Sequence, residues 1–184
     1  MSRPQTDPDA DLLPGLMAGE EHALRQLMDR RLSTLHRLGF RLLGDAVEAE
    51  DVCQETFLKF WQAAPGWRTG EARVLTWLCR VATNACYDRL RKRKPELPGE
   101  MADHADGRVS ADAALAERQR WDAVQAAMMT LPQPQRAAMA LRYDQALPQR
   151  EAAAVLGVGE KAYEALLVRA RKTLRAALKE SEHA

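Results

Sequence analysis

Five residues between positions 80 and 94 could together hold a single strand of nucleic acid. Arg80, Asn84, Tyr87, Arg91 and Lys94 follow one another at spacings of four, three, four and three, which places them on one face of an α-helix. Cations bind phosphates and planar side chains stack on exposed bases, so this combination suits single-stranded DNA better than duplex DNA. A basic helix face can also be simply a solvated surface, and the spacing alone does not separate these two interpretations.

A tryptophan-bearing loop, APGWRTGEAR at residues 64–73, comes directly before this helix. It supplies Trp67, Arg68 and Arg73, which extend the same mixture of aromatic and cationic groups. With this loop beside the helix, the residues support a strand-binding surface and a solvated face about equally.

A second candidate for nucleic-acid binding lies at residues 151–174, EAAAVLGVGEKAYEALLVRARKTL. The pattern predicts a short helix, a glycine turn and a longer basic helix, with Ala153 and Leu156 facing Tyr163 and Leu167 across the turn. Such packing gives a near-perpendicular helix pair, whose second helix can enter a DNA major groove. Arg169, Arg171, Lys172 and Arg175 follow on the second helix, whereas Glu160 and Glu164 would repel a phosphate.

The sequence offers no clear set of residues for catalysis or metal binding. Cys53, Cys79 and Cys86 lack C-x-x-C spacing, so they predict buried, reduced thiols rather than a zinc site, and a redox role stays open. The four histidines are scattered, and we find neither a nucleophile motif nor a phosphate-cradling loop. We therefore expect no enzyme, no cofactor and no metal.

The elements that must position these groups are helical. No alternating Val/Ile/Thr run is present, and apolar residues recur at spacings of three, four and seven, which predicts an all-α fold. Gly44 and Asp45 should end one long helix and begin the next. A Pro- and Gly-containing acidic stretch predicts a flexible linker at residues 96–111, between helical domains at 1–95 and 112–184.

The net charge of +1 hides an alternation of charged blocks. Residues 1–60, 61–95, 96–125 and 126–184 carry formal charges of −4, +6, −4 and +3. Two separate basic blocks indicate two local contacts with a polyanion rather than a uniform coating. The polar N-terminus lacks a signal-peptide pattern and no apolar run is long enough to cross a bilayer, so we expect a cytoplasmic protein.

Three ordered segments carry a family resemblance. DAVEAEDVCQETFLKFWQA, TWLCRVATNACYDRLRKRK and LPQPQRAAMALRYDQALPQREAAAVLGV resemble bacterial RNA polymerase sigma factors of the extracytoplasmic-function group. The resemblance covers about residues 10–178. It implies an alternative sigma factor whose partners are core RNA polymerase, promoter DNA and an anti-sigma factor.

The resemblance implies three contact surfaces. The helix that docks on the β′ clamp would present Asp51, Gln54, Glu55, Leu58 and Trp61. The surface for the non-template strand of the −10 element would comprise Trp67, Arg68, Arg73, Arg80, Asn84, Tyr87 and Arg91. The second domain would sit on the β flap and read the −35 duplex with Arg150, Lys161, Tyr163, Glu164, Arg169, Arg171 and Lys172.

The chain departs from the family pattern inside the helix-turn-helix. Pro148 stands where a Ser or Thr cap is common, and Glu164, Ala165 and Leu166 stand where basic or hydroxyl residues are common. A proline in the first turn of a helix costs little. Either Glu164 accepts a hydrogen bond from a cytosine amino group, or the flanking Lys161, Arg169 and Arg171 carry the −35 contact.

Two other functions fit parts of the pattern. A sigma-like decoy would sequester an anti-sigma factor without initiating transcription, and an independent helix-turn-helix regulator would bind duplex DNA as a dimer. The decoy predicts decay of the polymerase-docking and strand-binding faces, whose residues are present here, and the regulator would need no first domain.

Overall fold

The computed structural model describes residues 7–70, 72–93 and 121–181, and within these ranges it contains helices and no strand. The predicted all-α fold is thus confirmed. The predicted linker at residues 96–111 lies outside the described residues. The α-helices are α1 (Leu13–Met17), α2 (Glu21–Leu43), α3 (Ala46–Ala63), α4 (Val74–Lys92), α6 (Gln133–Met139), α7 (Gln149–Val155) and α8 (Glu160–Ser181). Residues 121–129 are also helical, and two single turns, η1 (Ala64–Gly66) and the π-helical η2 (Ala140–Asp144), complete the described elements.

The connection between α2 and α3 is specified by two adjacent residues. Gly44 adopts a left-handed conformation with φ of +71°, and its N–H donates to the carbonyl of Phe40 at 2.8 Å, which ends α2. Asp45 then accepts the N–H of Glu48 at 2.9 Å and caps α3. The helix boundary predicted at these two positions is confirmed.

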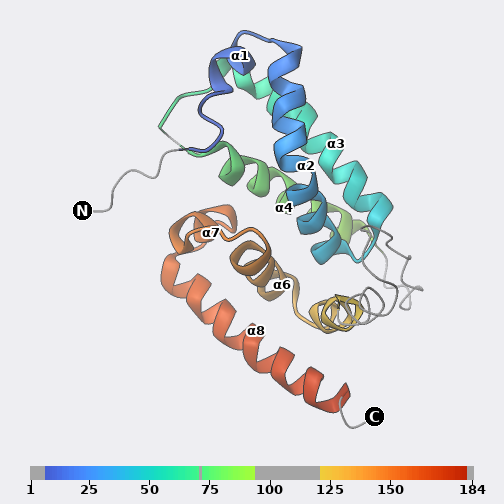
Figure 1. Cartoon of the computed structure of the whole chain (residues 1–184). Helices are drawn as coiled ribbons and strands as arrows, with labels where there is room; N and C mark the ends of the chain where they lie inside the picture. Colours follow the sequence, from blue (N-terminus) through green and yellow to red (C-terminus); the bar gives the residue numbers. More distant parts are fainter. Residues whose placement is uncertain (1–6, 71, 94–120, 182–184) are drawn as a thin grey trace, which may run out of the picture.

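The first structural unit is a bundle of α2, α3 and α4 with α1 packed against one end (Figure 1). Gly39 allows α2 and α3 to approach closely, because a Cβ built there would lie 3.1 Å from the Cβ of Ala49. Between the helices lies a buried apolar core that includes Leu27, Leu38 and Phe60. This core holds α3 and α4 so that their polar sides face outward.

The second unit contains the helix-turn-helix formed by α7 and α8. Gly157, with φ of +65°, makes the turn between them, and the N–H of Val158 donates to the carbonyl of Ala153. Leu167 and Ala170 of α8 are buried against the neighbouring helices. The opposite side of α8 is exposed over residues 160–177, where the structure describes its side chains, and is therefore available for contact.

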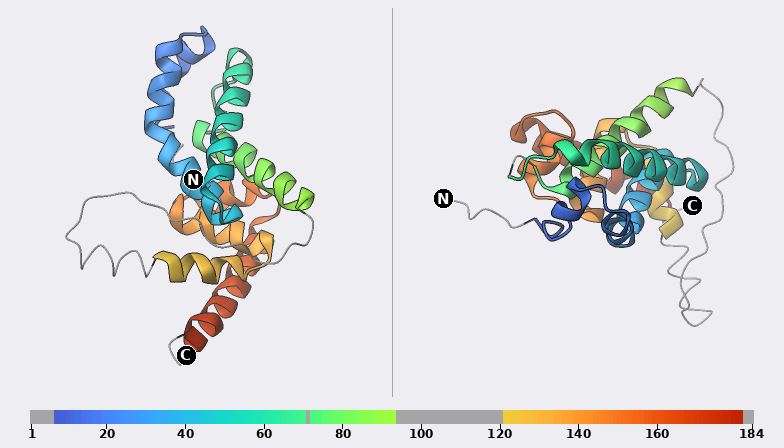
Figure 2. Two further views of the ribbon diagram at one scale, coloured as in Figure 1. Left: turned by 90° about the vertical axis from the view of Figure 1, so that its right-hand side faces the viewer. Right: turned by 90° about the horizontal axis from the view of Figure 1, so that it is seen from above.

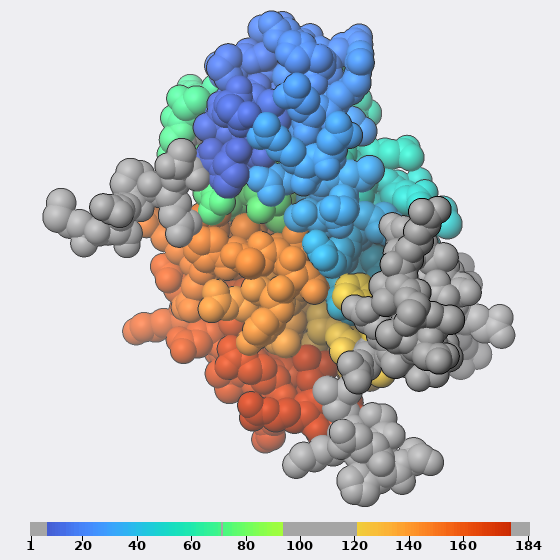
Figure 3. Space-filling view, viewed as in Figure 1, coloured from blue at the N-terminus to red at the C-terminus, as the bar shows by residue number. Residues whose placement is uncertain are grey.

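The two units pack directly against each other, a feature that the sequence did not predict. Figures 1 and 2 show α6 and α7 lying against α2 and α4, and one apolar cluster runs through both units. The space-filling view shows the surface of α2 meeting that of α6 and η2 (Figure 3). Polar contacts add to this interface, since Gln145 donates to the carbonyl of Thr34 at 3.1 Å and Arg136 donates to that of Leu42 at 2.6 Å.

Arg41 of α2 forms a further cross-unit contact, which is largely buried. Its side chain is 5% exposed and donates from Nε to Asp144 at 3.1 Å and from Nη1 to Gln125 at 3.1 Å. Its guanidinium carbon also lies 3.7 Å from the ring centre of Trp121. Burial lowers the pKa of Arg41, while the charge of Asp144 acts in the opposite direction. The arginine therefore depends on partners from the second unit to compensate for its burial.

Candidate nucleic-acid interface

The outer face of α3 carries the residues expected to contact polymerase. Asp51 and Gln54 are exposed, Trp61 is half-buried, and Leu58 exposes 58% of its surface. An exposed leucine that lies one helical turn from the amide of Gln54 and two turns from Asp51 is a surface that a partner protein can cover. The structure thus places these side chains together on one side of the first unit.

Glu55 on the same face is engaged within the unit. Its carboxylate accepts from Lys59 at 2.7 Å and from Arg89 of α4 at 3.0 Å. The hydrogen bond from Lys59, with that from Arg89, lowers the pKa of Glu55. Glu55 therefore ties α3 to α4 as well as contributing charge to the face expected to contact polymerase.

The expected strand-binding face on α4 is only partly open. Arg80, Asn84 and Arg91 are exposed, and Arg91 forms an ion pair with Asp88. Tyr87 is half-buried, and burial raises the pKa of its hydroxyl to about 12. This part of α4 presents two cations and an amide to solvent, with the tyrosine lying at their edge.

Trp67 holds the preceding loop in place. Its ring packs edge-on against Phe60, with centroids 5.5 Å apart, and against Trp77, with centroids 6.2 Å apart. Its neighbour Arg68 is exposed. The tryptophan is therefore a packing residue as well as a candidate for base contact, and its position fixes the start of the loop.

The start of α4 is held by two carboxylates from distant parts of the chain. Asp7 accepts the N–H of Val74 at 2.8 Å. Glu151 of α7 forms an ion pair with Arg73 at 3.1 Å and accepts a hydrogen bond from the hydroxyl of Thr76. Thr76 and Glu151 were not among the residues predicted for the site, because no local spacing links positions 75 residues apart.

The exposed side of α8 gathers most of the residues expected at the −35 element. Lys161, Glu164, Ala165, Val168 and Arg169 line a shallow surface hollow of about 420 Å³. The remaining expected cations are also exposed, and they are Arg150 on α7 and Arg171 and Lys172 on α8. The arrangement gives α8 a mixed charged and apolar face of the width that a major groove accepts.

Tyr163 is a correction to the predicted site. Its side chain is fully buried, and its hydroxyl donates to the carbonyl of Ala138 at 2.9 Å. Its position on the inward side of α8 makes it a core residue that anchors α8 to α6. It does not reach a DNA surface in this arrangement.

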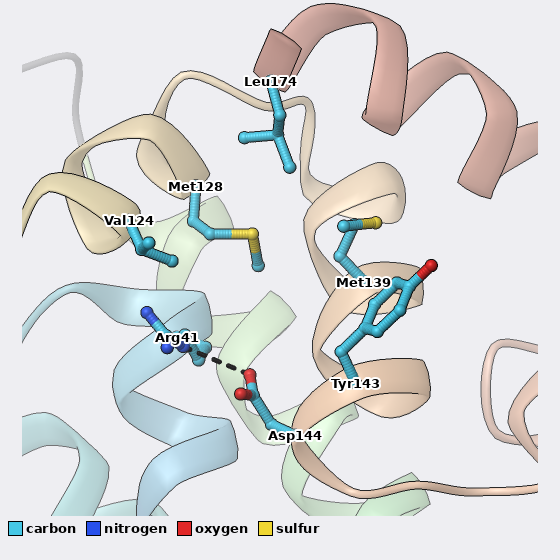
Figure 4. A pocket seen from close by; sticks show the side chains of 7 residues that line it. All are labelled: Arg41, Val124, Met128, Met139, Tyr143, Asp144 and Leu174. Atoms are coloured by element: carbon cyan, nitrogen blue, oxygen red, sulfur yellow. Dashed lines mark hydrogen bonds and ion pairs between the residues drawn. The ribbon is translucent and has the colours of Figure 1, made fainter. Parts of the chain in front are cut away.

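The cavity where the two units meet is small and mostly apolar. It has a volume of about 110 Å³ and is lined by Arg41, Val124, Met128, Met139, Tyr143, Asp144 and Leu174. Figure 4 shows the Arg41–Asp144 ion pair at one side, with the two methionine side chains opposite. The lining contains no pair of side chains arranged as nucleophile and base.

The three cysteines are free and buried, as predicted, and burial raises the pKa of each thiol to about 12. Across residues 7–70, 72–93 and 121–181, no group of three His, Cys, Asp or Glu side chains could hold a metal ion. In that same part of the chain, no helix combines the length and apolar character needed to cross a membrane.

Comparisons with known proteins match each of the two units to a described family. The family description "Sigma-70 region 2" matches residues 27–96, and "Sigma-70, region 4" matches residues 121–174. The ECF RNA polymerase sigma factor SigM of Mycobacterium tuberculosis is 34% identical over 169 residues, which cover 90% of this chain and 82% of SigM.

Two solved structures share the arrangement. CnrH, solved in complex with the cytosolic domain of CnrY, superimposes with a TM-score of 0.72 at 27% identity, covering 94% of this chain and 97% of CnrH. The sigma factor RpoE of Bartonella quintana, solved with the anti-sigma factor NepR, superimposes with a TM-score of 0.69 at 23% identity, covering 84% and 96% of the two chains. Because RpoE is only 23% identical to this chain, its likeness shows a shared fold alone.

Proposed function

Because this chain belongs to the extracytoplasmic-function group of RNA polymerase sigma factors, we propose that it binds core polymerase through α3 and directs promoter-specific initiation. The observation that carries this proposal is the exposed face of α3, where Leu58 lies beside Asp51 and Gln54. It acts in the cytoplasm as a specificity subunit and performs no catalysis of its own.

Promoter recognition is divided between the two units in this proposal. The loop after η1 and the exposed residues of α4 take the non-template strand of the −10 element, in keeping with the exposure of Arg68, Arg80 and Asn84. The outward side of α8 reads the −35 duplex, because residues near the start of a recognition helix reach base edges. Glu164 then accepts from a cytosine amino group, while Lys161 and Arg169 beside it contact phosphates.

Regulation by an anti-sigma factor is the second part of the proposal. CnrH is bound to the cytosolic domain of a second protein in its solved complex, and it shares this chain's fold over nearly its whole length. The exposed apolar side chains of Val124 and Tyr143, beside the cavity between the units, offer a surface for such a partner. Identifying that partner would lead to the inducing signal, and identifying the regulon would lead to the promoter sequence.

The test is a titration of fluorescently labelled protein with purified core RNA polymerase. An Asp51→Ala, Gln54→Ala variant should lose most of the binding, because it removes the polar part of the α3 face without touching the core. Asp29→Ala is the matched control, since Asp29 is an exposed aspartate on α2. If the intact, folded protein fails to bind core polymerase, the proposal is wrong and the anti-sigma decoy becomes the leading function.

A further inference from the structure

Two donors at the start of α4 hold both oxygens of one carboxylate. Arg73 donates from Nη1 to Oε1 of Glu151 at 3.1 Å, and the hydroxyl of Thr76 donates to Oε2 of the same group. The side chains of Arg73 and Glu151 are only 20% and 22% exposed, so water screens the pair weakly. The N–H of Val74, which follows Arg73 in the sequence, is already occupied by Asp7. The two side chains thus form a small built site for an anion with two oxygens.

This pair of donors also suits a DNA phosphate. A phosphodiester carries one negative charge and two non-bridging oxygens, and arginine and hydroxyl side chains are among its usual protein donors. A carboxylate presents the same charge and a similar pair of oxygens. Glu151 therefore has the chemistry of a substitute for a phosphate at this position.

The site continues the expected strand-binding face along α4. Arg73, Thr76, Arg80 and Asn84 follow one another at spacings of three, four and four, so they lie on one side of the helix. Arg80 and Asn84 are exposed, whereas Arg73 and Thr76 are partly covered by α7. A strand running along α4 would meet the covered part at the helix start.

We propose that Arg73 and Thr76 bind a backbone phosphate of the captured DNA strand, and that Glu151 occupies their site when the two units are closed. The inference rests on the proposed function, since it deepens the −10 contact. Closure and strand capture then exclude one another, because one site cannot hold both anions. Closure also brings α7, the helix that spans the DNA backbone in a helix-turn-helix, against the start of α4, whereas the outward side of α8 remains exposed.

The competition favours closure in the free protein. Glu151 belongs to the same chain, so its effective concentration at the site is on the order of millimolar or higher. Free single-stranded DNA at micromolar concentration competes poorly with such an internal ligand. Contacts that hold the two units apart would remove Glu151 from the site and release the donors for DNA.

The test measures strand binding by the isolated full-length protein. Glu151→Gln keeps the size of the side chain and removes its charge, so we expect about tenfold tighter binding of a labelled single-stranded oligonucleotide of about 12 nucleotides. Fluorescence anisotropy at two salt concentrations gives the affinity. Asp122→Asn is the matched control, because it removes one charge from an exposed residue of the second unit, and it should change the affinity by less than about twofold.

Two double variants test whether the gain in oligonucleotide affinity depends on Arg73 and Thr76. Arg73→Gln or Thr76→Val, each combined with Glu151→Gln, should remove most of the gain while circular dichroism shows an unchanged helix content. The proposal is overturned if Glu151→Gln binds no better than Asp122→Asn. It is equally overturned if both double variants retain the full gain, or if no variant binds the oligonucleotide.

This experiment contains no polymerase, so its failure is distinguishable from that of the proposed function. Loss of the Glu151→Gln effect in a protein that still binds core polymerase refutes the phosphate site alone. A normal Glu151→Gln effect in a protein that does not bind core polymerase refutes the polymerase role and leaves a strand-binding site.

Discussion

Replacing Arg41 with methionine should loosen the contact between the two units. Methionine keeps most of the apolar stem but loses the ionic hydrogen bond to Asp144, the hydrogen bond to Gln125 and the cation–π contact with Trp121. Hydrogen bonds to charged groups contribute about 1.5 to 3 kcal/mol each, and a cation–π contact about 1 kcal/mol. Asp144, whose side chain is 19% exposed, regains some hydration. We therefore expect a net loss of about 3 kcal/mol.

A loss of this size shifts the equilibrium between closed and open units by roughly 100-fold. Urea unfolding, followed by circular dichroism and tryptophan fluorescence, measures the change in the free energy of unfolding. The matched control is Arg37→Met, because Arg37 is an exposed arginine one turn earlier on α2. It should change stability by less than about 0.5 kcal/mol.

A double-mutant cycle with Asp144→Asn separates the contribution of the Arg41–Asp144 ion pair from those of the contacts with Gln125 and Trp121. Asp144 directly contacts Arg41, so the double variant should lose about 1 to 2 kcal/mol less than the sum of the two single variants. If Arg41→Met lowered the free energy of unfolding by less than about 1 kcal/mol, the reasoning would be refuted. Strict additivity in the cycle would show that the ion pair makes no coupled contribution.

Three further predictions concern Tyr163, the cap of α3 and the cysteines. Tyr163→Phe should destabilise the protein by about 1 kcal/mol in urea unfolding, because the hydrogen bond to Ala138 is lost; −35 duplex binding should not change, and a specific loss of binding would contradict the buried position. Asp45→Ala should cost about 1 kcal/mol by calorimetry, because the N–H of Glu48 loses its cap, whereas Asp45→Asn should retain most of the stability. Burial raises the pKa of all three thiols to about 12, so a thiol reagent at about pH 8 should modify them only after denaturation; rapid reaction of the folded protein would show that a thiol is accessible.

Local signals were sufficient to predict the boundary between α2 and α3. Gly44 and Asp45 determine where α2 ends and α3 begins, because both act through backbone geometry and hydrogen bonds within a few residues. The apolar spacing likewise predicted the all-α fold. Such features depend on neighbours in the sequence, and a sequence displays them directly.

Tyr163 shows where a local pattern is ambiguous. It lies on a helix expected to touch DNA, and tyrosine suits both a base contact and a packed core. The structure places it on the same side of α8 as the buried Leu167 and Ala170. Burying the ring removes apolar surface from water, and the hydroxyl still finds an acceptor in Ala138.

Packing between the units could not be predicted from spacing. Arg41 and Asp144 lie 103 positions apart, and Thr76 and Glu151 lie 75 positions apart. Each residue alone resembles an ordinary charged or polar surface residue. Only the three-dimensional arrangement pairs them and shows that part of the expected strand-binding face is covered.

If α8 reads the −35 duplex as proposed, its separation into two sides bears on how promoter preference can diverge during evolution. Tyr163, Leu167 and Ala170 attach the helix to its unit, while Glu164 and Val168 face outward and take no part in that attachment. Mutations on the outward side therefore have little effect on folding stability. Selection acts on them mainly through the change in which genes are transcribed. A duplicated gene copy can acquire a new set of target promoters through a few such changes and remain a stable protein at every step.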